Sequence, residues 1–202
     1  MLTATYTLVS LSVEQASMRL SLLSFQKVMH VQWRHQRQLT SAQLRDVAAS
    51  LGRLAHHSYW RKVDQYLIPV IRQAAPRCGP LLDELDSLNS AALASVAAVQ
   101  QCAFAALESS TQQIDALCAA VDVFCAAMTA RLEKEERELF VLARKVIAGE
   151  AWFAIAHQLL AQDARARDQR RHGADTRAVV PGPGVLLPPR QQQDARLEKL
   201  IA

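Results

Sequence analysis

The sequence is poor in glycine and in aromatic residues, and it lacks the motifs that mark common enzyme classes. Only 6 of 202 residues are glycine and 5% are aromatic, while 50% are hydrophobic, mostly alanine, leucine and valine. This composition suits closely packed helices. The chain contains no glycine-rich phosphate loop, no GxSxG and no HExxH. We therefore expect an all-α protein that is not an enzyme.

Strong charge and paired cysteines are also missing. The net charge of +4 is small, and acidic residues interleave with the basic ones, so the sequence predicts no nucleic-acid partner. The cysteines form no CxxC pair, which favours reduced thiols in a cytoplasm. They are Cys78, Cys102, Cys118 and Cys125.

No secretion signal is apparent at the N-terminus, which lacks a basic segment followed by a long apolar core. Ser87 to Leu107 contains no charged residue, so a membrane span has to be considered. Its asparagine, glutamines and serines, and its high alanine content, favour a buried helix instead. We expect a cytoplasmic protein of bacterial type with no membrane partner.

Apolar residues recur at helical spacing along most of the chain and predict long helices joined by short connections. Four such helices with short turns predict an up-down-up-down bundle. The expected helices run from Ser12, with Gln15 completing a capping box, to about His35; from Thr40 or Ser41 to about Ala75, bent at Pro69; from Pro80 to about Leu107; and from Thr111 to Ala148, ended by Gly149. A shorter fifth helix follows.

The C-terminal part of the chain has a different character. It contains prolines, glycines and arginines and lacks a sustained apolar stripe. The sequence therefore predicts two regions: a helical bundle over residues 1–165 and a flexible tail over residues 166–202.

Polar residues interrupt the inner stripes of the predicted helices. Glu135 stands on the stripe between Leu132 and Leu139, with Arg131 one turn before it. Gln15 and Asn89 hold comparable places in two other helices. Inward polar groups on several helices predict a site at the centre of the bundle, although scattered polar residues satisfied by backbone or water would give the same pattern.

Two segments resemble the hemerythrin-like family, the bacterial HHE cation-binding domains. "RLEKEERELFVLARKVIAGEAW" is similar to the family's His-x-x-x-Glu-Glu-x-x-Leu-Phe-Pro stretch and the tryptophan that opens its next helix. "YWRKVDQYLIP" is similar to the family's His-His-Pro-Lys-Glu-Asp-x-Tyr-Leu-Phe-Pro. The resemblance covers about Val13 to Leu160 and is most specific in these two segments. It implies a four-helix bundle around a non-haem metal site, often di-iron.

The positions that match the family's metal ligands are mostly occupied by poor ligands. Only Glu135 is a good one, since arginine carries a fixed positive charge, valine offers no donor atom, tyrosine would have to ionise, and the amides are weak donors. The matching positions are Gln15, Tyr59, Val63, Asn89, Arg131 and Glu135. The resemblance thus implies a degenerate member without metal or other cofactor, acting as a regulatory or protein-interaction module that could also form a homo-oligomer.

The sequence leaves alternatives open. Arg131 and Glu135 form either a buried ion pair, in which the arginine replaces the charge of the metal, or an ordinary exposed pair one turn apart. A shifted metal site could use His56 with Glu135, giving iron binding at low occupancy for oxygen or redox sensing or iron handling. An emptied core near Tyr59, Val63 and Asn89 could instead bind a small apolar ligand.

Overall fold

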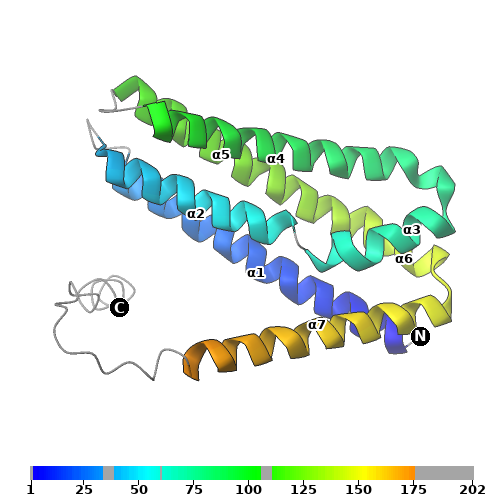
Figure 1. The fold of residues 1–202 in the computed structure, drawn as a ribbon. Helices are drawn as coiled ribbons and strands as arrows, with labels where there is room; N and C mark the ends of the chain where they lie inside the picture. Colours follow the sequence, from blue (N-terminus) through cyan, green and yellow to red (C-terminus); the bar gives the residue numbers. More distant parts are fainter. Residues whose placement is uncertain (1, 34–38, 60, 106–110, 176–202) are drawn as a thin grey trace. The chain divides into compact units, whose positions relative to one another are not determined.

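The computed structural model describes residues 2–33, 39–59, 61–105 and 111–175; nearly all of these residues are helical, and none of them is in a strand. The predicted all-α class is confirmed (Figure 1). By its contacts the chain divides into two compact units, residues 1–162 and 163–202. Helix continues to Asp175, so the first part of the segment predicted to be a flexible tail is helical.

Several helices are shorter than expected because π turns and breaks divide them. The elements are α1 (Leu2–Trp33), α2 (Ser41–Tyr59), the π turn η1 (Val63–Leu67), α3 (Ile68–Ala74), the 3-10 turn η2 (Pro76–Cys78), α4 (Gly79–Ala105), α5 (Thr111–Lys134), the π turn η3 (Glu135–Leu139), α6 (Phe140–Val146) and α7 (Gly149–Asp175).

The predicted start of the second helix is confirmed, whereas that of the first is wrong. The backbone N–H of Thr40 donates to Gln43 Oε1 at 2.9 Å, and the N–H of Gln43 donates to Thr40 Oγ1 at 3.3 Å, which is a capping box. At Ser12, by contrast, the helix is already ten residues long. Leu8 and Leu11 are buried in the core, and this packing stabilises helix upstream of the apparent cap.

The second predicted helix is interrupted at Arg61, and a π turn precedes Pro69. After α2 ends at Tyr59, Arg61 is not helical, and the wide turn η1 leads directly into α3. Pro69 stands near the first position of α3, where its missing N–H is tolerated. The break gives Arg61 a direction that a continuous helix would not.

The fourth predicted helix contains the second π turn and ends earlier than expected. Its last helical residue is Val146, and Ile147 adopts an extended conformation with φ −86° and ψ 124°. Gly149 begins α7 instead of ending the preceding helix. The chain changes direction between α6 and α7 at Ile147, whose side chain is buried. A buried apolar residue, rather than a glycine, therefore marks the end of α6.

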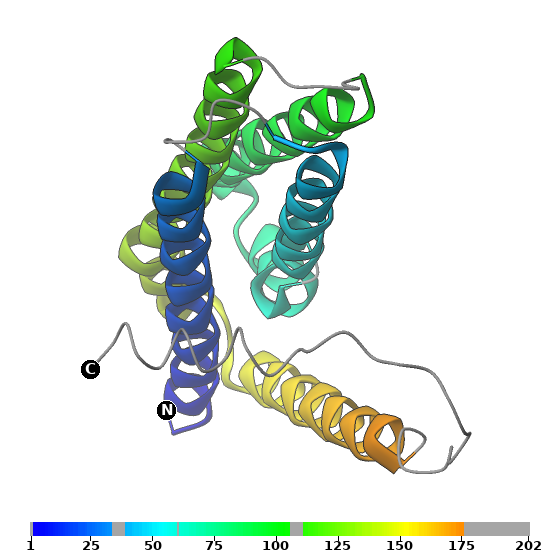
Figure 2. The ribbon, with the colours of Figure 1, turned by 90° about the vertical axis from the view of Figure 1, so that its left-hand side faces the viewer.

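The first unit contains two clusters of buried apolar residues. Within it, α1 packs against α5, α5 against α4, and α4 against α2 (Figures 1 and 2). The first apolar cluster is formed by α1, α2, α4 and α5 and includes Met18, Leu22, Leu51, Ala92, Phe124 and Leu132. The second is formed by the start of α1, η1, α3, the start of α4, η3, α6 and α7, and includes Leu11, Val63, Leu85, Leu139, Trp152 and Ile155.

One helical run among the described residues, Gln113–Val146, is long and apolar enough to cross a membrane by length and composition. The same run supplies Val121, Phe124 and Met128 to the first apolar cluster. A helix from the middle of a protein core passes this test as readily as a membrane span does, so the run is weak evidence for a membrane.

Candidate functional site

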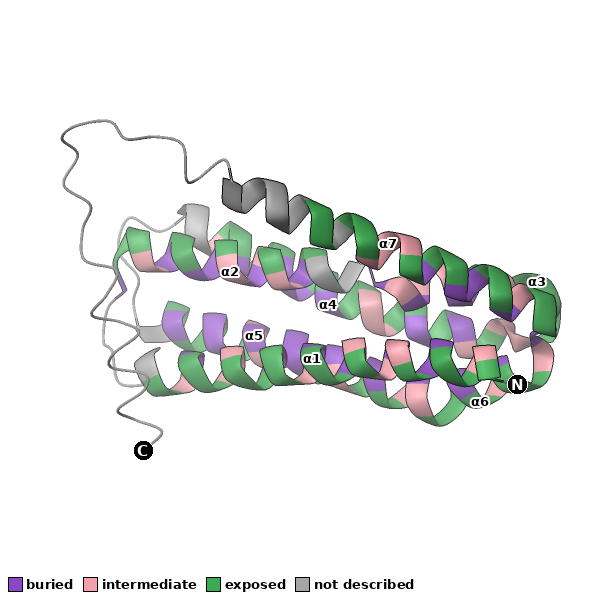
Figure 3. Cartoon of the chain, turned by 90° about the horizontal axis from the view of Figure 1, so that it is seen from below, coloured by how far each residue is buried: buried purple, intermediate pink, exposed green. Residues whose placement is uncertain are grey.

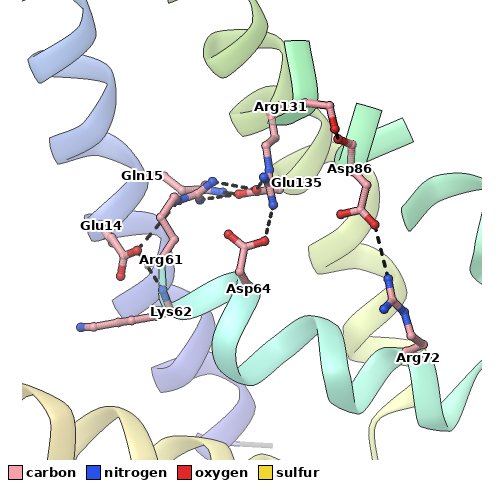
Figure 4. A network of polar contacts seen from close by, with 10 residues as sticks. Glu14, Gln15, Arg61, Lys62, Asp64, Arg72, Asp86, Arg131 and Glu135 are labelled. Atoms are coloured by element: carbon pink, nitrogen blue, oxygen red, sulfur yellow. Dashed lines mark hydrogen bonds and ion pairs between the residues drawn. The ribbon is translucent and has the colours of Figure 1, made fainter. Parts of the chain in front are cut away.

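A layer of polar side chains separates the two apolar clusters. Along α1, Gln15 lies between Leu11 of the second cluster and Met18 of the first. Along α5 and η3, Glu135 lies between Leu132 and Leu139 in the same way. We call this group the polar layer; its members are Gln15, Arg61, Asp64, Arg131 and Glu135 (Figure 4).

The carboxylate of Glu135 is fully buried and accepts four hydrogen bonds. Arg61 donates two of them in a bidentate arrangement, Nη1 to Oε1 at 2.7 Å and Nη2 to Oε2 at 2.5 Å. Arg131 Nε donates to Oε1 at 3.1 Å, and Gln15 Nε2 donates to Oε2 at 2.7 Å. A carboxylate has about four lone-pair positions, so these donors use its accepting capacity completely.

Arg131 connects Glu135 to a second carboxylate. Its Nη2 donates to Asp64 Oδ1, while its Nε contacts Glu135 one turn along the same helix (Figure 4). The side chains of Arg131 and Glu135 are 1% and 0% exposed, whereas that of Asp64 is 25% exposed. The prediction that Arg131 and Glu135 form a buried pair is therefore confirmed, and the pair belongs to a larger cluster.

The positive and negative charges within the polar layer are equal in number. Arg61 and Arg131 supply two positive charges, and Asp64 and Glu135 supply two negative ones. Glu14 approaches from α1, with its Oε1 3.9 Å from Arg61 Nε. The same oxygen accepts a hydrogen bond from the backbone N–H of Lys62 at 3.1 Å, which fixes the start of the turn that presents Arg61.

Burial and charge shift the ionisation of the groups around the layer in opposite directions. Loss of solvent raises the pKa of Asp64, although Arg131 pulls it down. Loss of solvent also raises the pKa of Glu14, against the hydrogen bond from Lys62. For Arg61, burial alone would lower the pKa, but the carboxylates of Glu135, Asp64 and Glu14 together outweigh it, so this pKa is raised. Arg61 remains a permanent cation, whereas Asp64 and Glu14 ionise less readily than usual.

Three buried atoms of the layer have no hydrogen-bond partner within the described residues. They are Gln15 Oε1, Arg61 Nε and Asp64 Oδ2. Leaving such a group unpaired costs about 1–3 kcal/mol. These unpaired atoms reduce the net contribution of the layer to stability. Most of the hydrogen bonds of the layer are made to one carboxylate, that of Glu135.

The structure brings together three of the residues predicted from the sequence, Gln15, Arg131 and Glu135. Val63 is fully buried but packs in the second apolar cluster. Asn89 is half-buried on α4 and makes none of the hydrogen bonds to Glu135. The side chain of Tyr59 lies outside the described residues. His56 is exposed, whereas Glu135 is fully buried, so these two do not form the shifted site.

Arg61 and Asp64 are the members of the layer that sequence reasoning missed. Arg61 follows the end of α2, where a continuous helix would turn it away from the stripe. The sequence gives one indirect indication of Arg61. A buried carboxylate such as Glu135 needs hydrogen-bond donors on all sides, which predicts a further cation beside it. The match of Asp64 to the family's aspartate identified the position without indicating its contact with Arg131.

The residues of the polar layer do not fit the metal that the resemblance implies. No group of three or more His, Cys, Asp or Glu capable of holding a metal ion is found in the described part of the chain. Two guanidinium groups contact the single buried carboxylate, and they would repel a cation. Any metal ligated by Glu135 would also have to displace one of its four donors.

Taken together, the fold and the site define an all-α protein with a buried arginine–carboxylate cluster at its centre. Comparisons of the chain with protein-family models, with curated proteins and with solved structures found no match. The hemerythrin-like resemblance therefore depends on the two sequence segments that carry it and stays a prediction.

Proposed function

We propose that the protein is a hemerythrin-like four-helix bundle whose metal site has been replaced by an ion-pair cluster, and that it acts as a non-enzymatic regulatory or protein-interaction module. In this proposal α1, α2 with η1 and α3, α4, and α5 with η3 and α6 are the four helices, in up-down-up-down order. Their neighbour relations and the first apolar cluster that they share support this arrangement.

The π turns also support the proposal. Val63 is the first residue of η1, and Glu135 is the first residue of η3. These are the two positions that match the glutamate ligands of the family. Single-turn π segments inside helices occur frequently at functional sites, because they redirect side chains that a regular helix could not aim inward. A bundle derived from a metal protein would keep this backbone geometry after its ligands had changed.

The observation that carries the proposal is the saturated carboxylate of Glu135. Two arginines and an amide fill all of its accepting positions, and the arginines provide the positive charge that a metal would supply. The cluster therefore has a structural part in holding the helices together. Because its donors saturate the buried Glu135 carboxylate, this carboxylate has no oxygen lone pair left to act on a substrate, which favours a binding or regulatory activity at the surface.

Elemental analysis of protein expressed in iron-rich medium tests the proposal. We expect well below one iron per chain and no oxo-bridged charge-transfer bands in the absorption spectrum, because no imidazole occupies the matching positions. Treatment with a chelator should leave the unfolding temperature unchanged. A hemerythrin-like protein with intact histidine ligands, expressed in the same medium, is the positive control. Two irons per chain would contradict the proposal.

A further inference from the structure

The exposed face of α1 carries an apolar stripe with coiled-coil spacing. Successive members are four and three residues apart, which is the heptad period, and the stripe spans about three heptads. Val13 and Leu20 are 65% and 66% exposed. Gln15 and the residues that α1 contributes to the core lie on its buried face. Figure 3 shows exposed residues along α1 in green. We call the apolar ones at heptad spacing the α1 stripe; its members are Leu2, Tyr6, Val9, Val13, Ala16, Leu20 and Leu23.

A helix that is apolar on both faces usually has a partner on both. Because apolar stripes of this length are rarely left in water on a monomer, the α1 stripe marks an interaction surface. The charged residues of α1 indicate which kind of partner fits this surface.

The helix that carries the stripe has few charged residues of its own. From Leu2 to Met18 the only charged residue of α1 is Glu14, which is engaged by the backbone of Lys62. Arg19 is paired with Glu136 at 2.8 Å. An anionic lipid surface would need basic residues beside the apolar face, and a charged protein partner would need an opposite charge; the stripe offers neither. A second copy of α1 is neutral and apolar in the same places.

The two ends of the stripe differ in shape, and this difference makes two copies complementary when their α1 helices run antiparallel. At its N-terminal end, a groove of about 330 Å³ lies between α1 and α7, lined by Leu2, Tyr6, Phe153 and Leu160. At its other end stand Leu20 and Leu23, which are 66% and 63% exposed. In an antiparallel pair centred on Val13, Leu20 of one copy lies opposite Tyr6 of the other, and Leu23 lies opposite Leu2.

Charge also selects the antiparallel direction. In a parallel pair, Lys27 of one copy would lie beside Lys27 of the other, and like charges across an interface are unfavourable. In the antiparallel pair, Lys27 extends past the other helix. Ala16 then lies close to Val9, so a small residue meets a larger one near the centre, which allows close packing.

We propose that the protein forms a symmetric homodimer in which the α1 stripes of two copies pack antiparallel, with Leu20 and Leu23 of each copy seated in the groove between α1 and α7 of the other. The contact is isologous, so the same patch serves on both sides. It does not depend on whether the polar layer ever held a metal, because the stripe and Gln15 occupy opposite faces of α1.

The experiment is a mass measurement of the full chain by light scattering after gel filtration, at about 100 µM, where contacts of micromolar affinity are populated. The wild type should have the mass of a dimer. Val13→Lys with Leu20→Lys should be monomeric, because it places four positive charges in the interface of two copies. The neutral version, Val13→Gln with Leu20→Gln, should weaken association at least tenfold and covers the case in which the lysines disturb folding.

Val123→Lys is the matched control, since Val123 is an exposed apolar residue of α5 outside the stripe. This variant should remain a dimer. Helical circular dichroism confirms that each variant is folded. A monomeric wild type would overturn the proposal, as would a folded double-glutamine variant that dimerises like the wild type. Sedimentation of the monomer with neutral phosphatidylcholine vesicles would overturn it in favour of a lipid surface.

Discussion

Arg61 and Glu135 are 74 residues apart in the sequence and face each other through two parallel hydrogen bonds inside the protein. Both side chains are almost completely inaccessible to solvent. A bidentate arginine–carboxylate pair is one of the strongest polar contacts available to side chains, and here it joins the break after α2 to the π turn after α5. The two places where the helices depart from regular geometry are therefore tied to each other.

Arg61→Ala should be strongly destabilising. It removes two of the four donors of Glu135 and leaves a buried carboxylate with incomplete pairing, at a cost of about 3–5 kcal/mol. Arg72→Ala is a matched control, because Arg72 pairs with Asp86 at 3.5 Å on the surface, where a pair contributes about 0–1 kcal/mol. Urea unfolding of both variants measures the difference. Equal effects of the two substitutions would show that Arg61 is not part of a buried cluster in solution.

Replacing Arg131 and Glu135 together by apolar residues should not restore the stability of the wild type. Arg131→Met with Glu135→Leu would leave Arg61 buried and without its main partner, so this double variant should stay several kcal/mol below the wild type. Adding Arg61→Met should recover much of the loss, since well-packed apolar residues often replace a buried ion cluster without cost. Asp64 loses its arginine in both variants, but it is partly exposed and can turn toward solvent.

If the double variant were as stable as the wild type, Arg61 would have to find another partner or reach solvent. That outcome would mean that Arg131 and Glu135 form an independent pair, and that the bidentate contact of Arg61 contributes little.

The sequence predicted the helices and three of the five members of the polar layer, and the failure to predict Arg61 has a physical cause. Gln15, Arg131 and Glu135 lie on regular helical stripes, so their inward direction follows from periodicity. Arg61 points inward from a non-helical position between α2 and η1, and nothing local in the sequence indicates that this position leaves the helix. Tertiary contacts, chiefly the salt bridge to Glu135 and the Glu14–Lys62 hydrogen bond, hold the broken geometry.

The helix boundaries show the same division between local and tertiary control. Thr40 and Gln43 form a capping box that can be recognised in the sequence and is present in the structure. The start of α1 and its exposed stripe could not be located in this way, because the residues before Ser12 carry no strong helical signal of their own. Their helix is stabilised by burying Leu8 and Leu11.

The pH dependence of stability should reveal the burial of Asp64 and Glu14. Because burial raises the pKa of each carboxyl in the folded state, the folded protein binds protons more tightly than the unfolded chain does. These two groups therefore make stability fall as the pH rises from the ordinary carboxyl range through the raised pKa values. The neutral variants Asp64→Asn and Glu14→Gln lack this contribution.

The measurement is the difference in unfolding free energy between each variant and the wild type, taken from about pH 4 to pH 7. We expect the variant to improve relative to the wild type as the pH rises. A difference that moves the other way would mean that the arginines, rather than burial, dominate the ionisation of that carboxyl.

Cys125 should be an unreactive thiol in the folded protein. It is buried in the first apolar cluster, and burial, helped by the nearby charge of Asp122, raises its pKa to about 11. Since the thiolate is the reactive form, alkylation at pH 8 should be slow until the protein unfolds. Mass spectrometry after iodoacetamide treatment compares it with the half-buried Cys78, which should react first. Rapid modification of Cys125 in the native protein would indicate that the centre of the first cluster opens readily.

Removing residues 176–202 should leave the helices of the first unit stable, whereas removing α7 as well should not. The side chains that α7 supplies to the second apolar cluster are Trp152, Ile155 and Leu159, all before the end of the first unit. Full burial of an apolar side chain of this kind contributes about 1.5–3 kcal/mol, so losing the three would remove a large part of the stability of an ordinary domain.

A chain ending at Asp175 keeps all three of these side chains. We expect its unfolding temperature, measured by circular dichroism, to lie within roughly 4 °C of that of the full chain, which corresponds to about 1 kcal/mol. A chain ending at Ala148 should unfold at a much lower temperature or fail to fold. If the chain ending at Asp175 were also strongly destabilised, the segment after it, with its "VLLPP" sequence, would have to bury apolar surface against the helices.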